Sequence, residues 1–440
     1  MGGPKAAWNR VQEVIPMRRK AYSCQSVKSV RLEKFLVDGE GQDAWVGIDV
    51  AKEDLKAVLH WGAEQFERPW NVENPGELKG FVELLTELSV GRKLIIAMEP
   101  SGTYGDAFRQ AAADAGLVVH RVSPKAAHDY AEIFDGVPSQ HDGKDAAIVA
   151  ELARQGKSAV WPWRRPQPVD EQIEYWVDRM DAHQRIAQVW TGRLEGRLAR
   201  HWPEAGGLLK LTSRTLLEAA AAYGGPAGLA ADEQAAEKLK RWGRGYLKPE
   251  KVQALLASAR HTAGVRQSEL DRRRLQDIGR SALAARREVR QAKRRLVALA
   301  QRRPAIRAMG QVVGIGTACV LWACLGDPRG YYCAGAYVKA MGLNLAERSS
   351  GKWAGHLKIS KRGYGMVRYW MYLAAIREVK SEPARSWYRA KRLKDGEKGG
   401  RALVAIMRRL AYALHPVACG ERFDVGRMFG RRRAEVARGG

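Results

Sequence analysis

Apolar and polar positions follow a strand-like pattern over the stretch that starts at residue 44. Residues 44–50 (AWVGIDV) are almost all apolar, as in a buried strand. Residues 54–61 (DLKAVLHW) and 64–72 (EQFERPWNV) alternate between apolar and polar side chains. Short apolar runs follow at 93–98 (KLIIAM) and 117–122 (LVVHRV). The pattern predicts five strands.

Helical patterns separate and follow these strands. Residues 74–88 (NPGELKGFVELLTEL) begin with Asn74 as the expected N-cap, Pro75 at the first helical position and Glu77 three residues after the cap. Further helices are expected near 105–115 and from about residues 125 and 142. Three strands followed by alternating helices and strands predict a mixed sheet covered by helices.

Two long segments in the middle of the chain repeat apolar positions at alternating steps of three and four. Sustained heptads of this kind predict coiled-coil helices, either as two arms of one antiparallel pair or as a dimer seam. His183 is interpreted as a polar register residue in the first seam, and residues 200–270 as a smaller helical insert between the arms. The seam positions are Ile173, Trp176, Met180, His183, Ala187, Trp190 and Leu194, then Leu275, Ile278, Ala282, Ala285, Val289, Ala292, Leu296 and Leu299.

The charge of the chain is strongly positive and unevenly distributed. The 75 Lys and Arg residues and 48 Asp and Glu residues give a net charge of +27, which favours a polyanion, most often nucleic acid. Residues 286–295 (RREVRQAKRR) concentrate that charge on the second heptad arm, either as a solvated face or as a contact for a nucleic-acid backbone. Residues 45–150 are instead acidic, with 10 basic and 17 acidic side chains. Such an island is either a solvated surface or a site for divalent cations between carboxylates and phosphates.

Composition excludes several classes of protein. The five cysteines show no paired spacing, so we expect buried thiols in a reducing interior and neither a disulfide framework nor a zinc site. The longest apolar run, at 312–326, is short and broken by glycine, so no membrane span is expected. The N-terminus lacks the apolar core of a targeting segment. The expected location is cytoplasmic and nucleoid-associated.

Four carboxylates stand at the ends of the predicted elements. Asp49 lies in the first strand, and Glu99 lies just past the end of another. Asp142 and Asp145 are three residues apart and therefore share one side of a helix start. Singly, Asp142 is also consistent with an N-cap and Asp49 with a turn. Together the four carboxylates predict a site for a pair of Mg²⁺ ions.

A basic segment in the last third of the chain carries two serines. Residues 348–377 contain seven basic side chains and no acid, a field that suits a phosphate and its transition state. Ser349 and Ser350 lie at its start, and a serine needs a base or a metal to attack phosphorus. The GIG turn at 314–316 either offers N–H groups to phosphate or is a plain tight turn. The expected phosphate or nucleic-acid contacts are Gly314, Gly316, Arg348, Lys352, Lys358, Lys361, Arg362 and Arg368.

The order of these motifs resembles a known family. GIDVAK, AMEPSGTYG and HDGKDAAIVAEL, followed by VVGIGTACVLWACLGDP, AYVKAMGLNLAERSSGK and GHLKISKRGYGMVRYWMYLAA, are similar to motifs of the insertion-sequence family 110 (DEDD) transposases, relatives of the Piv DNA invertase. The resemblance covers roughly 44–165 and 301–380. Two departures are the sequence SQHDGKD, which replaces the usual Lys-Thr-Asp lead-in, and residues 1–43, which precede the usual family start and make Met17 a second candidate start.

The resemblance implies a fold and a reaction. It implies an α/β plus α protein: a RuvC-like, ribonuclease-H-type domain, a helical coiled-coil region and a mostly helical domain with a nucleophilic serine. The serine maps to the Ser350–Gly351 pair, with Ser349 left open as its neighbour. The expected partners are donor and target DNA, a non-coding bridge RNA and further copies of the chain, as a dimer assembling to a tetramer. The implied catalytic residues are Asp49, Glu99, Asp142, Asp145 and Ser350, with the four carboxylates holding Mg²⁺.

The expected boundaries follow from the composition and the resemblance together. They are a basic extension (1–43), the RuvC-like domain (44–165), the coiled-coil region (166–300), the serine-bearing domain (301–415) and a basic tail (416–440).

Other classes compete with this interpretation. A RuvC-like junction resolvase needs the acidic domain but not the serine, and a non-catalytic nucleic-acid-binding protein needs neither. An actin-like ATPase or sugar kinase also begins with a loop like GIDVAK, but a second glycine-rich phosphate hairpin is not found in the sequence. Tyr331, Tyr332 and Tyr364 are alternative nucleophiles, although packing or stacking suits them better.

Overall fold

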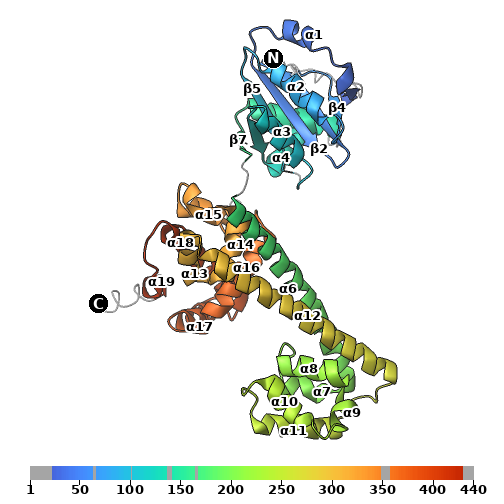
Figure 1. Ribbon diagram of the computed structural model, residues 1–440. Coiled ribbons are helices and arrows are strands. Elements are labelled where there is room, and N and C mark those ends of the chain that lie inside the picture. The colour runs from blue at the N-terminus through green and yellow to red at the C-terminus, as the bar shows by residue number, and fades with distance from the viewer. Residues whose placement is uncertain are drawn as a thin grey trace, which may run out of the picture. The chain divides into compact units, whose positions relative to one another are not determined.

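A computed structural model describes residues 22–62, 66–100, 102–135, 141–163, 167–347 and 357–429. The chain divides into two compact units, Met1–Arg165 and Pro166–Gly440 (Figure 1). Within the described part of the chain, no helix combines the length and the apolar character needed to cross a bilayer.

The first unit is built on one seven-stranded mixed sheet with the strand order β1-β4-β3-β2-β5-β6-β7. The central strand β2 pairs antiparallel with β3 and parallel with β5. β6 is parallel to β5, and β7 is antiparallel to β6. The strands are β1 (Gln25–Ser26), β2 (Ala44–Val50), β3 (Asp54–Trp61), β4 (Trp70–Glu73), β5 (Leu94–Met98), β6 (Val119–Val122) and β7 (Ser158–Val160).

Helices cover both faces of this sheet, and side chains that alternate along β2 divide between two cores. Val46 and Ile48 belong to the core under α2 and α3, which includes Phe81 and Phe108. On the opposite face, Trp45 packs with residues of α4 and α5. The helices are α1 (Leu32–Asp38), α2 (Leu78–Leu88), α3 (Asp106–Asp114), α4 (Pro124–Asp135) and α5 (Asp142–Arg154), with a short 3-10 helix at Val27–Ser29.

The described part of the predicted basic extension is folded onto the sheet. β1 pairs parallel with β4, and Val27 is buried in the main core. Phe35 of α1 packs edge-on against Trp70 at a ring distance of 5.9 Å. The strand is only two residues long and α1 only seven, so neither is long enough to show a period in the sequence.

The predicted start of α2 was wrong. α2 begins at Leu78, with Glu77 and not Asn74 at the N-cap position. The Asn74 side chain is used elsewhere, because its Nδ2 donates to the carbonyl oxygens of Lys52 and Tyr104. Glu77 instead accepts a hydrogen bond from the backbone N–H of Glu73.

The second unit is helical and is organised around two long helices, α6 (Pro168–His201) and α12 (Glu269–Ala300). Five shorter helices lie between them in sequence: α7 (Pro203–Leu208), α8 (Arg214–Tyr223), α9 (Pro226–Ala230), α10 (Ala235–Gly243) and α11 (Pro249–Arg260). The rest comprises α13 (Pro304–Val313), α14 (Ile315–Leu325), α15 (Ala334–Ala340), α16 (Gly365–Glu378), α17 (Ala384–Lys394), α18 (Gly399–Ala418), α19 (Val425–Phe429), a 3-10 helix (Pro328–Gly330) and the strand pair β8 (Leu345–Ala346) and β9 (Lys358–Ile359).

The two long helices run antiparallel and share a buried seam (Figure 1). Near the start of α6, Ile173 and Met180 lie in one core with Leu296 of α12. Near its end, Leu194 lies in a second core with Leu275. All eight seam positions predicted for α12 are buried, whereas Trp176, His183 and Trp190 of α6 are only partly covered.

The core of the C-terminal helices is completed by the long pair. Val177 from α6 and Ala292 from α12 belong to the same cluster as Trp322 of α14, Trp370 of α16 and Leu410 of α18. The helices between residues 304 and 418 therefore pack against one end of the α6–α12 pair and share its core.

Candidate active site

Asp49 lies on the central strand of the sheet and faces α5. Along β2, Val46, Ile48 and Val50 are buried on the α2 side, so the alternation of the strand directs Asp49 to the opposite face. Asp49 is partly exposed. Its position inside β2 excludes the turn-forming role that the sequence had left open.

Gly47 allows α5 to contact this strand directly. A Cβ atom at Gly47 would lie 2.1 Å from the backbone oxygen of Ala146 and 2.3 Å from the nitrogen of Ala150, distances that atoms cannot adopt. Only glycine therefore permits this backbone-to-backbone contact. The close contact holds the first turn of α5 beside the end of β2.

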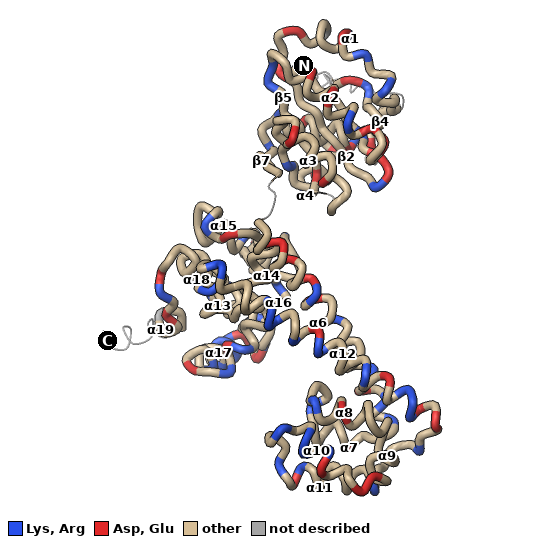
Figure 2. Tube along the Cα trace, viewed as in Figure 1, with Lys and Arg blue, Asp and Glu red and all other residues tan. Residues whose placement is uncertain are grey.

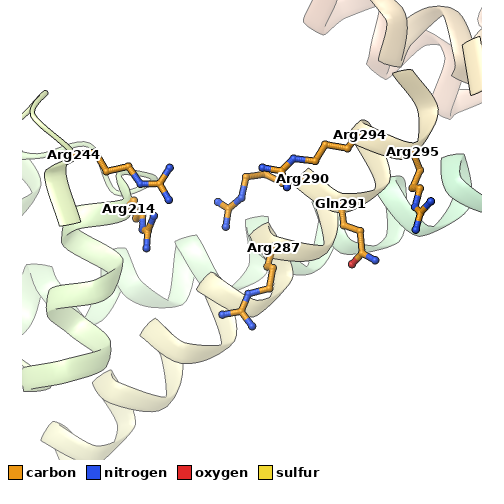
Figure 3. A pocket seen from close by; sticks show the side chains of 7 residues that line it. All are labelled: Arg214, Arg244, Arg287, Arg290, Gln291, Arg294 and Arg295. Carbon is orange, nitrogen blue, oxygen red and sulfur yellow. The ribbon is translucent and has the colours of Figure 1, made fainter. Parts of the chain in front are cut away.

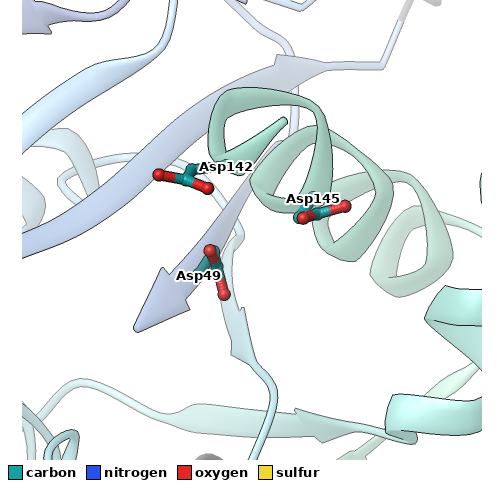
Figure 4. A group of neighbouring side chains, drawn as sticks. All are labelled: Asp49, Asp142 and Asp145. Atoms are coloured by element: carbon teal, nitrogen blue, oxygen red, sulfur yellow. The ribbon is translucent and has the colours of Figure 1, made fainter. Parts of the chain in front are cut away.

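Asp142 and Asp145 stand on that first turn. Asp142 is the first residue of α5 and its N-cap is His141, so Asp142 is not the cap. The helix dipole favours acidic side chains at this end. One ligand oxygen from each of Asp49, Asp142 and Asp145 can be chosen so that all three lie within 4.8 Å of one another (Figure 4). The structure thus brings together three of the four predicted carboxylates.

Glu99 lies beside this group but does not belong to it at that distance. In the parallel pairing of β2 with β5, Ile48 is opposite Met98, so Glu99 follows next to Asp49. Ala97 faces the α5 side and Met98 the other side, so the alternation brings Glu99 to the face of Asp49.

Burial and mutual repulsion raise the pKa values of these carboxyl groups. Burial, together with repulsion from Asp145 and Asp142, raises the pKa of Asp49 to about 6. The pKa of Glu99 is raised by burial and by Asp49 and Asp145. The pKa of Asp145 is raised by burial and by Asp142, against a smaller opposing effect of Lys144. The site therefore carries more negative charge than it can stabilise alone.

The three aspartates suit a divalent cation. Carboxylate oxygens are the ligands of Mg²⁺, which binds them at about 2.1 Å. Two oxygens on opposite sides of such an ion lie about 4 Å apart, so small side-chain movements suffice to bring these oxygens, now within 4.8 Å, around one ion. A cation there would also relieve the repulsion that raises the pKa values.

Two residues of this site were not predicted. Gly47 carried a sequence signal, because a glycine inside an apolar strand often marks the close approach of another backbone. No feature of the sequence marked Lys144, which is fully buried although it lies between the charged residues Asp142 and Asp145.

The serine segment falls outside the described residues. This applies to Ser349 and Ser350, and also to the predicted phosphate contacts Arg348 and Lys352. On the far side of that stretch, Lys358 lies in β9, and Lys361 and Arg362 follow it as exposed residues. Arg368 lies in α16 and donates to the carbonyl oxygen of Gly363.

The GIG turn is a tight connection between packed helices. Gly314 has a φ of 76°, a conformation that favours glycine, at the junction of α13 and α14. The guanidinium of Arg377 lies against it and donates to the carbonyl oxygen of Val313. Packing thus accounts for Gly314 without a ligand, and phosphate binding by Gly314 and Gly316 stays a prediction.

The comparisons with known proteins bear on both units. Residues 46–191 match the family model of the IS110 DEDD transposases, a stretch that includes all four predicted carboxylates. Residues 310–389 match the model of the transposase IS116/IS110/IS902 family. No curated protein sequence matches the chain significantly.

The two matches follow the same order as the motifs and together span more than half of the 440 residues. Transposases of this kind cleave DNA and transfer its strands, and the DEDD type depends on divalent metal. With its acidic triad in the first matched segment, the chain belongs to the IS110 family of transposases.

Proposed function

We propose that the chain cuts and rejoins DNA through a covalent phosphoserine intermediate, with four carboxylates holding Mg²⁺ at the reacting phosphate. The observation that carries the proposal is the convergence of Asp49, Asp142 and Asp145 from a strand and a helix of the matched DEDD segment. Glu99, just past the end of the neighbouring strand β5, completes the proposed set.

The carboxylates have a defined task in this scheme. They hold the cation on one face of the sheet. Their attraction to the cation offsets the repulsion between the carboxylates. A bound divalent cation supplies charge neutralisation at the phosphate and activates an attacking oxygen.

Ser350 is the proposed nucleophile. Its hydroxyl oxygen forms a bond to phosphorus while the bond from phosphorus to a deoxyribose oxygen breaks, and that sugar oxygen leaves with a proton. One phosphodiester replaces another, so a second DNA strand can reverse the reaction without an external energy source. The basic side chains after residue 348 provide the field for the anionic transition state.

A non-coding RNA transcribed beside the gene is the proposed guide for donor and target DNA, and the chain is proposed to act as a dimer that assembles to a tetramer. The net charge of +27 supports a partner that is a nucleic acid.

The test uses full-length protein, DNA from the flanks of the gene and RNA transcribed from those flanks. We expect Mg²⁺-dependent cleavage and a covalent protein–DNA adduct in the wild type. Asp49→Asn and Asp145→Asn should lose both, whereas Asp43→Asn, an exposed carboxylate ahead of β2, should keep both. Cleavage without an adduct would indicate a resolvase-type reaction, and cleavage by the Asp49 variant in excess chelator would refute the metal site.

A further inference from the structure

The basic charge of α12 is distributed in two different ways along its length (Figure 2). In the first half, arginines pair with acids one turn away: Arg273 with Glu269 at 3.2 Å and Arg280 with Asp277 at 2.7 Å. In the stretch 286–295 the one acid is Glu288, which pairs with Arg179 of α6. The arginines of the second half therefore lack acids on their own helix.

These arginines line a hollow between α12 and the helices of the insert. The hollow has a volume of about 530 Å³, and six of its lining residues are arginines. Arg214 at the start of α8 and Arg244 at the end of α10 lie across from Arg290 (Figure 3). The six are Arg214, Arg244, Arg287, Arg290, Arg294 and Arg295, and Gln291 lies among them.

Within the described residues, the lining of the hollow contains no acidic side chain, and Arg244, Arg287, Arg290 and Arg294 form no ion pair there. Arg214 does have a carboxylate partner, Glu218, but on its own helix. These four guanidinium groups thus line the hollow without a carboxylate, an arrangement that leaves their N–H donors available to a ligand.

Without an anion, the arginines of the hollow repel one another. Burial lowers the pKa of Arg290, and Arg214, Arg244, Arg287 and Arg294 lower it further by repulsion. Arg244 has a φ of 50° and a ψ of 39°, a left-handed conformation in which helices commonly end with glycine. An arginine kept in a conformation that favours glycine, among five other arginines, supports a role in binding.

The ligand must carry several negative charges close together. Guanidinium groups form paired hydrogen bonds with phosphate oxygens. The two non-bridging oxygens of a single phosphodiester are too few to pair with all six arginines that line the hollow. Consecutive phosphates of a nucleic-acid strand supply such charges at regular spacing.

We propose that this hollow binds consecutive backbone phosphates of a nucleic-acid strand and so fixes the strand between α12 and the insert. The inference rests on the proposed function only in that nucleic acid is the substrate. Backbone contacts of this kind set position and carry no base preference. RNA and DNA share the chemistry, and the experiment separates them.

The experiment compares full-length variants in a binding assay with chelator and without divalent metal. The probes are a folded single-stranded RNA, a single-stranded DNA and a duplex DNA of equal length, each titrated between about 50 and 200 mM salt. The test variant is Arg290→Gln with Arg294→Gln. Its matched control is Arg273→Gln with Arg280→Gln, which removes two arginines that are exposed and paired on the same helix.

The test variant should bind its polymer about tenfold more weakly for each arginine lost. The slope of log affinity against log salt should become shallower by about 1.4 for a single strand or about 1.8 for a duplex. The control pair should change neither quantity. The polymer whose slope changes identifies the occupant of the hollow.

Arg244→Gly guards against a folding artefact. Because glycine suits the left-handed conformation, this variant should be at least as stable as the wild type and still bind more weakly. Unchanged slopes for all three probes, or equal losses in the control pair, would overturn the proposal. Because this assay contains chelator and no divalent metal, it measures the hollow without the metal site, so failure of the metal site and failure of the hollow give different results.

Discussion

Replacing Asp49 with asparagine should stabilise the metal-free protein. The side chain of Asp49 extends from β2 towards the first turn of α5. Burial and the neighbouring Asp145 and Asp142 raise its pKa from 3.8 to about 6. Its ionised form is therefore less favourable in the folded protein than in the unfolded chain. Asparagine has nearly the same shape and no charge, so Asp49→Asn removes this penalty.

The size of the effect follows from the pKa difference. At about 1.36 kcal/mol per pH unit, the rise corresponds to about 3 kcal/mol at neutral pH. Because the Asp49 side chain is partly exposed, solvent screening reduces this to about 1–2 kcal/mol. For a unit of this size, the melting temperature should increase by about 2–8 °C.

The pH dependence has a defined sign. Since the folded protein binds the proton more tightly than the unfolded chain, wild-type stability falls as pH rises through the window from about 4 to about 6. The advantage of Asp49→Asn should therefore be absent near pH 4 and complete above pH 6.

Calorimetry of the full chain in chelator measures the difference, and hydrogen exchange of the β2 amides assigns it to the first unit. Asp43→Asn serves as the control, because Asp43 is exposed and lies outside the group of three aspartates. A lower melting temperature for Asp49→Asn at pH 7 would refute the electrostatic reasoning.

Three further changes probe other parts of the molecule. Gly47→Ala should destabilise the first unit by about 3 kcal/mol in denaturant unfolding, because its Cβ would overlap the α5 backbone at Ala146; unchanged stability would show that α5 can move away. Ser350→Ala should keep nucleic-acid binding but lose every covalent protein–DNA adduct in mass spectrometry, while Ser349→Ala should be far milder; an adduct that persists in the first variant would reassign the nucleophile. Asp170→Ala should cost about 2–3 kcal/mol, because its carboxylate accepts hydrogen bonds from Arg303 and from Trp322 Nε1; a loss below half a kcal/mol in thermal unfolding would contradict that role.

Strong periodic patterns were sufficient to locate the longest elements. β2 coincides with the apolar run at 44–50 and β3 with the alternation at 54–61, and the eight apolar seam positions of α12 are all buried. The three aspartates were found because strand ends and a helix start gather at one edge of a sheet. In these cases each local preference agrees with the packing around it.

Features that depend on distant partners were missed. Nothing local shows that the side chain of Asn74 bonds to the carbonyl of Tyr104 and so leaves the cap position to Glu77. The arginine hollow is likewise invisible in sequence, because Arg214 and Arg244 meet Arg290 through the fold of the insert. Very short strands, such as β7, have too few residues for a detectable period.

The metal site itself is tested most directly by measuring Mn²⁺ binding to the full-length protein near neutral pH, with electron paramagnetic resonance as the detection method. Mn²⁺ takes the same oxygen ligands as Mg²⁺ and reports its bound fraction. The wild type and Asp43→Asn should bind the ion with equal affinity, and Asp49→Asn and Asp145→Asn should lose it. Equal binding by all four proteins would contradict the assignment of Asp49, Asp142 and Asp145 as the metal site.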